Sequence, residues 1–378
     1  MNLKALQSDW STCLRSTSVS IDNWITKLRC PSTHLALTKV SLAEAEARVG
    51  SRLLPRESKP IAIGQTPSVL LREDAKIAYP ILDDVPVLMS PESLESHAPT
   101  HDMEDLRWAE AYAEMEHYNT QALSSVDSER MAPLVRMLTV LAESETIKQQ
   151  NRGDWVDSPY DAISQLEAFD YLGEIKGKRI AQIGGSGQQA LKFLLAGAAE
   201  AWLFTPMSGE AIFARNLAMR FGVSSRFHCV IAIGEELPIL PGYLDSVYMG
   251  GCLHHMNTAL ASEQIREALI AGGRFVAVEP WKTPLHTIGT RLLGKREEGA
   301  FCQPLTSSRI RPIRNNFDSV EVRHHGPLLR YLALGVCKIS RREMSVKLGI
   351  RLTRVDDRLP IPSRLGGSVA VLATKAAD

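Results

Sequence analysis

The stretch Lys178–Gly197, KRIAQIGGSGQQALKFLLAG, decides the fold of this chain. It begins with a short apolar run typical of a buried strand, passes through a glycine-rich turn, and continues with apolar residues at helical spacing. Glycines let the backbone turn sharply and let a ligand approach the main chain closely. The stretch therefore predicts the start of a parallel α/β sheet with a nucleotide-type cofactor site. A tight strand–helix turn without a ligand is the alternative.

Strand–helix alternation continues after this unit. The predicted strands are Arg179–Ile183, Ala201–Phe204, Phe227–Ile233, Ser246–Met249 and Arg274–Val278, with helices at Gln188–Leu195, Gly209–Phe221 and Ser262–Ala271. Strands joined by crossover helices predict a parallel sheet covered on both faces. Two later candidates, Ser319–Arg323 and Gly367–Thr374, would complete the sheet.

The composition bounds the class of protein. A length of 378 residues is enough for two domains, and the 43 basic residues are balanced by 43 acidic ones. This balance gives no overall attraction for nucleic acid, and no basic domain with interleaved aromatic residues is present. Six scattered cysteines without a C-x-x-C pair favour a reducing compartment. Without a signal-like or bilayer-spanning apolar segment, a cytoplasmic location is expected.

Three regions follow from the changes in pattern. Residues 1–100 predict a small N-terminal α+β domain, and residues 101–175 predict a helical connector or cap. Residues 176–378 form the predicted α/β domain, in which 327–358 are expected to add lid-like helices.

The N-terminal region contains two strand candidates, Pro67–Glu73 and Lys76–Met89. The second alternates but is interrupted by Pro80 and Pro86, and proline cannot donate a ladder hydrogen bond. The pattern therefore predicts a small edge hairpin rather than a central strand.

Four motifs between residues 176 and 281 carry a family resemblance. In chain order they are KGKRIAQIGGSG, AWLFTPMSGEAIFARNLAMRFGV, GEELPILPGYLDSVYMGGCLHHM and LIAGGRFVAVEPW. Their order and spacing resemble class I S-adenosylmethionine-dependent methyltransferases. The resemblance implies a Rossmann-like sheet of seven strands with an antiparallel last strand, S-adenosylmethionine as cofactor, and methyl transfer. It implies cofactor contacts at Gln182, Gly184, Gly185, Gly187, Thr205, Pro206, Met207, Glu235 and Gly250.

The chain departs from this family at the acidic contacts. The family places an acid at the end of the first strand, where this chain has Gln182, and another at the end of the second, where it has Thr205. The acid before the Leu-Pro turn is matched by Ile233, although Glu235 or Glu236 could take that role. The resemblance therefore supports the fold more firmly than cofactor binding.

A second resemblance lies in the N-terminal region. The segments LRCPSTHLAL and AYPILDDVPVLM resemble the small Trm112-like domain, which is often a zinc-ribbon partner of methyltransferases. Only Cys30 stands at a ligand-type position, and one thiolate cannot hold a structural zinc ion. We expect a metal-free version that supports the enzyme structurally, with substrate gating as the alternative.

Candidate reactive residues follow the fourth and fifth predicted strands, because ligands of such sheets bind beyond the carboxyl ends of the strands. His254 and His255 are candidate bases, with a helix-start pair bonded to backbone as the alternative. Glu279 is a candidate base, substrate anchor or structural strand-end carboxylate. Candidate substrate-pocket residues are Tyr248, Trp281 and His324, with core packing as the alternative for Tyr248. No metal site is predicted.

The segment Lys338–Arg354 is rich in basic residues and follows the apolar stretch Pro327–Val336. These helices could form a lid over a lipophilic or anionic substrate, or a surface for an acidic partner such as a carrier protein. A solvated basic helix on a packed apolar one is the alternative.

The sequence predicts a methyltransferase-like enzyme for a small molecule of specialised metabolism. Two alternatives stay open. In the first, the fold has lost the use of S-adenosylmethionine and promotes an elimination, cyclisation or hydrolysis. In the second, the chain is a non-catalytic partner subunit.

Overall fold

The computed structural model describes residues 21–49, 68–82, 84–90, 155–284, 304–341 and 343–377. Residues 101–154 of the predicted helical connector lie outside these ranges. The rest of the connector contains α6 (Ala162–Leu172).

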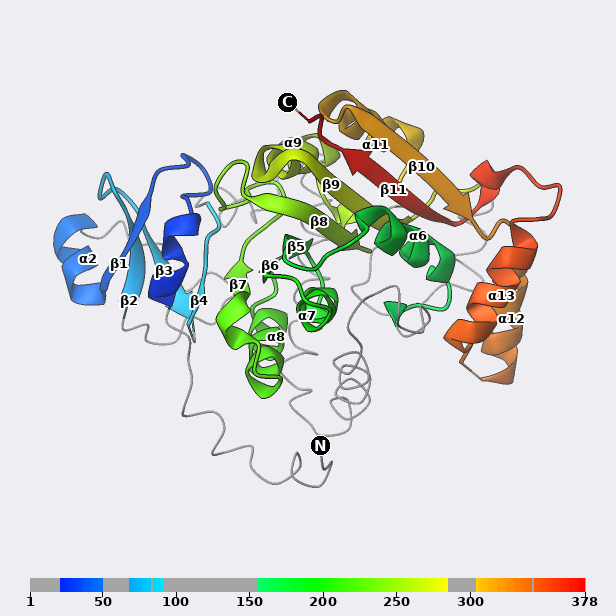
Figure 1. Ribbon diagram of the computed structural model, residues 1–378, viewed down its shortest axis with the longest axis horizontal. Coiled ribbons are helices and arrows are strands. Elements are labelled where there is room, and N and C mark those ends of the chain that lie inside the picture. The colour runs from blue at the N-terminus through cyan, green and yellow to red at the C-terminus, as the bar shows by residue number, and fades with distance from the viewer. Residues whose placement is uncertain are drawn as a thin grey trace, which may run out of the picture.

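The centre of the molecule is a sheet of seven strands (Figure 1). They are β5 (Arg179–Ile183), β6 (Glu200–Thr205), β7 (Phe227–Ile231), β8 (Leu244–Gly250), β9 (Leu269–Pro280), β10 (Ser319–His325) and β11 (Ser368–Thr374). Their spatial order is β10-β11-β9-β8-β5-β6-β7. Strands β9, β8, β5, β6 and β7 run parallel, and β11 runs antiparallel to both of its neighbours. This is the expected arrangement of a class I methyltransferase sheet.

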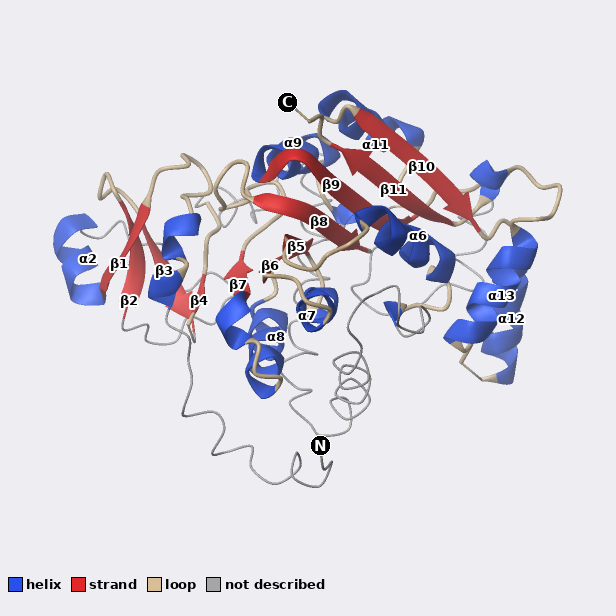
Figure 2. Cartoon of the chain, in the orientation of Figure 1, coloured by secondary structure: helices blue, strands red, loops and turns tan. Residues whose placement is uncertain are grey.

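Helices flank the sheet, as Figure 2 shows. They are α6, α7 (Gln188–Leu195), α8 (Ser208–Arg220), α9 (Thr258–Ala268) and α11 (Ser307–Asn316), with single 3₁₀ turns η6 (Ser224–Arg226) and η7 (Leu253–His255). Helix α6 packs on β9 and β11, whereas α9 and α11 pack on each other. The crossover helices explain why β5, β6 and β7 are almost wholly buried, since parallel strands are covered on both faces.

Two predicted boundaries differ from the structure. Helix α9 ends at Ala268 rather than Ala271, because Leu269 already pairs with Leu244 and β9 continues through Gly272 and Gly273. Strand β7 ends at Ile231, two residues before the predicted end. The glycine pair is therefore an irregular part of a strand rather than the break between a helix and a strand.

The N-terminal unit is a second, four-stranded sheet. It contains η2 (Ile21–Asn23), η3 (Ile25–Lys27), β1 (Leu37–Ser41), α2 (Leu42–Val49), β2 (Ser68–Arg72), β3 (Ala78–Leu82) and β4 (Val85–Pro86). The order β1-β2-β3-β4 places the antiparallel hairpin of β3 and β4 at one edge of this sheet, as predicted, with β4 outermost and β3 between β2 and β4. Pro80 is tolerated there because its carbonyl still accepts a hydrogen bond, from the Val87 amide at 2.9 Å.

The N-terminal unit covers the open edge of the large sheet at β7. Val87 forms a parallel bridge with Ile231, and the Leu88 amide donates to the Ile231 carbonyl at 2.8 Å. The ring of Trp24 meets that of Trp202 edge-on, with centroids 5.5 Å apart. Covering an edge strand removes a site of unwanted strand pairing. The two sheets therefore share one apolar core.

The other end of the molecule carries a helical hairpin of α12 (Leu329–Ser340) and α13 (Val346–Asp356), followed by η8 (Ser363–Leu365) (Figure 1). The hairpin lies within the predicted lid segment 327–358 and packs against α6. Among the residues that the structure describes, no helix combines the length and apolar character needed to cross a membrane.

Candidate functional site

The glycine turn after β5 adopts the conformation that only glycine takes easily. Gly184, Gly185 and Gly187 have φ angles of 75°, 71° and 75°. A Cβ atom on Gly187 would lie 2.8 Å from both Ala214 and Leu203, and one on Gly184 would lie 2.7 Å from the Cβ atom of Cys252. Gly184 and Gly187 are therefore required by internal packing, whether or not a ligand binds.

Gln182 is buried and occupied within its own turn. Its Nε2 atom donates to the Gly184 carbonyl at 2.9 Å, and its Oε1 atom accepts from the Ala190 amide at 2.9 Å. Both ends of the side-chain amide thus fasten the glycine turn to the first turn of α7. Gln182, at the position of the family's first acid, therefore forms both of these hydrogen bonds within its own strand–turn–helix unit.

Thr205 ends β6 and is completely buried. Its Oγ1 atom accepts a long hydrogen bond, 3.4 Å, from the amide of Met207. Pro206 and Met207 are half-buried and lead into α8. Neither Thr205 nor the two residues after it carries a carboxylate that could accept hydrogen bonds from both hydroxyls of a ribose.

The two acids after β7, Glu235 and Glu236, accept hydrogen bonds from different residues. The Oε1 atom of Glu235 accepts from the Asn257 amide at 2.8 Å, and burial raises the pKa of this carboxyl to about 7. Glu236 instead binds Ser90 of the N-terminal unit, accepting from its hydroxyl at 2.7 Å and its amide at 3.1 Å. Glu235 is thus a buried carboxyl that titrates near neutral pH at the carboxyl edge of the sheet.

Glu279, near the end of β9, is fully buried and organises the loop after β8. Its carboxylate accepts from the backbone amides of Cys252, Leu253 and His254 at 3.1, 2.8 and 3.4 Å. The Nδ1 atom of His254 lies 2.6 Å from Glu279 Oε2. Of the three roles that the sequence left open for Glu279, these contacts support the structural one.

Arg309 of α11 holds the other side of the same loop. Its guanidinium donates to the backbone carbonyls of His254 and Met256, both at 2.8 Å. Sequence reasoning missed this residue, because nothing in the local pattern of α11 links it to residues 254–256. Glu279 and Arg309 together fix the backbone that carries the histidine pair.

His254 and His255 are brought together, with ring centroids 3.8 Å apart. Burial, together with His254 and Arg309, lowers the pKa of His255 to about 3. A neutral imidazole of such low basicity is suited to holding a polar group by a hydrogen bond rather than to removing a proton at neutral pH.

The three predicted substrate-pocket residues separate into two places. Trp281 and His324 meet edge-on, with centroids 4.6 Å apart, just beyond β9 and near the end of β10. Burial and the neighbouring His325 lower the pKa of His324 to about 4.

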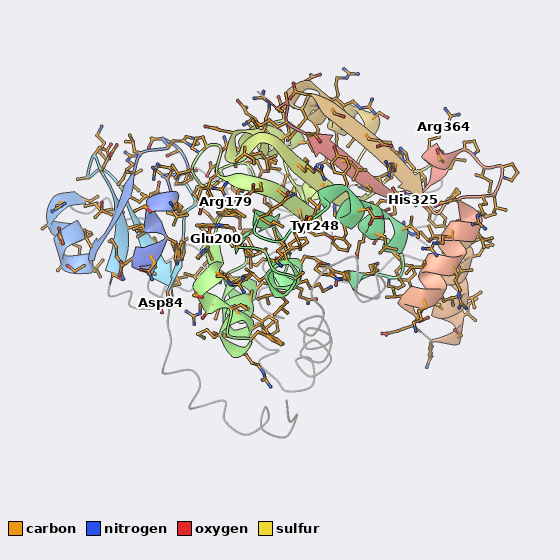
Figure 3. The ribbon with its side chains drawn as sticks, in the orientation of Figure 1. Asp84, Arg179, Glu200, Tyr248, His325 and Arg364 are labelled. Atoms are coloured by element: carbon orange, nitrogen blue, oxygen red, sulfur yellow. The ribbon has the colours of Figure 1, made fainter. Side chains whose placement is uncertain are left out.

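Tyr248 is buried and stacks on Phe169 of α6, with centroids 5.6 Å apart. Figure 3 shows Tyr248 near the centre of the molecule, well separated from His325. Its hydroxyl lies beside Gly250, where an added Cβ atom would be 3.0 Å away from it.

The residues of this edge do not fit the usual recognition of S-adenosylmethionine. The backbone turn is present, but Gln182 is internally bonded, Thr205 carries no charge, and Ile233 is buried. The nearby acids Glu235 and Glu236 are directed to Asn257 and Ser90. The glycine turn is present, but none of Gln182, Thr205 and Ile233 carries a carboxylate at the positions where the resembled family has acids.

In the N-terminal unit, Cys30 lies among polar side chains instead of metal ligands. Its sulfur is 3.1 Å from the Tyr79 hydroxyl and 3.7 Å from the Arg72 guanidinium. Although burial raises its pKa, hydrogen bonds from Thr33, Tyr79, Ser32 and Arg72 lower it to about 7. Within the described ranges, no group of three or more His, Cys, Asp or Glu residues is placed to hold a metal ion.

Comparison with known proteins finds similar solved structures, three of which are 14–17% identical to this chain. No family model matches the chain, and no curated protein sequence matches it. Geranyl diphosphate C-methyltransferase from Streptomyces coelicolor A3(2) is 14% identical, with a TM-score of 0.42 over 58% of this chain and 85% of that one. The [4+2]-cyclase SpnF is 17% identical, with a TM-score of 0.40 over 66% and 96% of the two chains. The YcgJ protein from Bacillus subtilis is 16% identical, with a TM-score of 0.39 over 56% and 100%. At these values the fold assignment rests on the strand order, which is that of the class I methyltransferases.

Proposed function

We propose that this chain is a methyltransferase-like enzyme that converts a small molecule at the carboxyl edge of its sheet without S-adenosylmethionine as group donor. One observation carries the proposal. The side chains at the family's acidic positions, Gln182 and Thr205, are buried, and Gln182 is closed on its own loop. The region around the glycine turn, where the resembled family binds its cofactor, is then available to a substrate.

Energetics support the loss of the cofactor. A hydrogen bond to a charged group contributes about 1.5–3 kcal/mol, so two missing carboxylate contacts weaken binding by about 100-fold or more. Rotating Gln182 toward a ligand would also break its bonds to Gly184 and Ala190. A buried donor and acceptor would then be left unsatisfied, which adds to the loss.

The chemistry that remains is proton transfer and substrate positioning. Glu235, with a pKa near 7, can exchange a proton at neutral pH, as a general acid or base must. His255 is neutral and can hold a polar group, and the edge-on pair of Trp281 and His324 provides aromatic surface. These groups suit an elimination or cyclisation of a small molecule better than a reaction that needs a charged cofactor.

The deciding experiment is calorimetric titration of the full chain with S-adenosylmethionine and with S-adenosylhomocysteine. We expect no heat of binding at millimolar ligand and no rise in the melting temperature. Binding near micromolar would overturn the proposal. An established methyltransferase titrated under the same conditions is the control for ligand quality.

Methyl transfer from S-adenosylmethionine to a small molecule is the second candidate. It is favoured by the left-handed conformation of Gly185, where a Cβ would meet, of the residues described, just the Gln182 amide nitrogen, at 3.2 Å. This opening suits a ligand near the backbone turn. If the titration shows micromolar binding, this candidate replaces the first, and release of S-adenosylhomocysteine with a panel of small acceptors is the next measurement. The Trm112-like origin of residues 1–100, a protein partner and a cytoplasmic location stay predictions.

A further inference from the structure

The hairpin of α12 and α13 exposes apolar side chains in rows. The exposed fractions are 58% for Leu332, 64% for Val336, 86% for Ile339, 46% for Leu348 and 51% for Val355. The first three are spaced by four and three residues on α12, and the last two by seven on α13, so each helix carries its row along one side. Large apolar residues grouped in this way mark an interaction surface.

The exposure of these rows does not result from a detached hairpin, because the hairpin is packed against the rest of the molecule. Val346 and Ile350 of α13 pack on the cluster of Val156, Ile163 and Leu166. The buried carboxylate of Asp356 accepts from the backbone amides of Leu328 and Leu329, at 2.9 and 2.8 Å, and so caps the start of α12. The hairpin is a fixed element whose apolar rows point away from the core.

A basic row lies beside the apolar row of α13. Lys347, Arg351 and Arg354 of α13 are exposed and spaced by four and three residues, so they share one side of the helix, and the exposed Arg358 follows in the turn after it. Asp356 and Asp357 do not neutralise them, because Asp356 caps α12 and Asp357 binds His325. A chain with no net charge therefore concentrates positive charge on the element that also exposes apolar side chains.

We propose that the α12–α13 hairpin docks on an anionic lipid membrane surface. Leucine, valine and isoleucine beside arginine and lysine, on one fixed pair of helices, match a helix that lies in the interface with its basic side toward lipid phosphates. A protein hot spot would instead centre on tryptophan, tyrosine or arginine held in a well-packed pocket. The apolar rows here are aliphatic throughout.

The position of the hairpin gives this docking a consequence for the site. His325 at the end of β10 pairs with Ser368, which pairs with Pro280 at the end of β9. The hairpin therefore leaves the sheet at the same edge as Trp281 and His324. Docking would bring that edge close to the lipid headgroups.

The test is co-sedimentation of the full chain with vesicles of phosphatidylcholine alone or mixed with phosphatidylglycerol. We expect binding only to the mixed vesicles, weakened by salt. Arg351→Glu with Arg354→Glu should weaken the binding by at least about 30-fold, because each basic residue near an anionic surface adds to the affinity for that surface. Leu332→Asp with Val336→Asp should weaken it by about 100-fold.

Matched variants elsewhere on the surface separate docking from general charge and folding effects. Arg311→Glu with Arg314→Glu repeats the charge change on α11, where both residues are exposed, and Leu260→Asp repeats the apolar change on α9. Both controls should bind vesicles like the unmodified chain, and circular dichroism should match for all variants. Equal binding to uncharged vesicles, an equal effect of the controls, or no binding at all would overturn the proposal. Self-association that Leu332→Asp abolishes, without vesicle binding, would overturn it in favour of a second copy of the chain.

Discussion

The Nδ1 atom of His254 lies 2.6 Å from the Oε2 atom of Glu279, inside a loop that the same carboxylate holds by three backbone amides. The carboxylate is completely buried, and in the described part of the chain these donors stabilise it. Glu279 therefore holds the loop after β8 in place. It thereby sets the position of both histidines.

Replacement of Glu279 by alanine should destabilise the fold strongly. The change leaves four buried donors without their acceptor, and we expect a loss of about 3–5 kcal/mol in the free energy of unfolding. Urea denaturation measures it. Glu279→Gln keeps one acceptor oxygen and should lose less. A loss below about 1 kcal/mol for Glu279→Ala would contradict the role given to this carboxylate.

Glu235→Gln should change the dependence of stability on pH. Burial raises the folded-state pKa of Glu235 to about 7 from its ordinary value of 4.5, so its contribution to stability is present below pH 4.5 and is lost as the pH rises through 7. Glutamine stays neutral and can still accept from the Asn257 amide. The variant should therefore match the unmodified chain near pH 4.5 and exceed it by about 3 kcal/mol at pH 8. Equal stability at both pH values would contradict the buried, titrating carboxyl.

The sequence was informative where apolar runs are bounded by glycine. The bounds of β5 and α7 were predicted to the residue, because the glycine turn between them needs left-handed backbone that other residues avoid. The start of β9 was misplaced, because Gly272 and Gly273 resemble a helix end when the pairing of Leu269 with Leu244 is unknown.

The sequence predicts which residues lie at the carboxyl edge of the sheet, but it does not predict their contacts. The order of the strands places His254, Glu279 and Trp281 at one edge, since parallel strands end together. The contact of Arg309 with the His254 carbonyl joins residues 55 apart, and no local pattern predicts it. Whether Gln182 faces a ligand or its own loop also depends on side-chain geometry that the residue type does not determine.

His325 should anchor the α12–α13 hairpin through its charge. Its Nδ1 atom lies 2.7 Å from Asp357 and its Nε2 atom 2.9 Å from Glu167. Although burial lowers the pKa of His325, these two carboxylates raise it to about 9 from its ordinary value of 6.5. The stabilisation is present below pH 6.5 and is lost as the pH rises through 9.

His325→Gln should therefore cost about 2–3 kcal/mol at pH 6 and little at pH 10. Urea denaturation at both pH values measures the difference. Limited trypsin digestion reports on the hairpin itself, because Arg351 and Arg354 lie on its exposed side. His324→Gln is the control, since His324 is neutral in this range and contacts neither carboxylate. A cost that is the same at both pH values would show that His325 acts by packing and not by charge.

The buried Lys192 provides the last prediction, because its side chain is completely inaccessible while that of its partner Asp157 is 35% exposed. Lys192 also donates to the Trp155 carbonyl at 3.0 Å, so it ties the segment before α6 to the helix that follows the glycine turn. Asp157→Ala leaves a buried ammonium without its counter-ion and should cost about 3–5 kcal/mol. Lys192→Met should cost less, because Asp157 can be hydrated and methionine fills the space. The double variant should then be no less stable than Asp157→Ala alone, which denaturation of all four chains tests. Simple addition of the two single losses would show that the pair does not act as one unit.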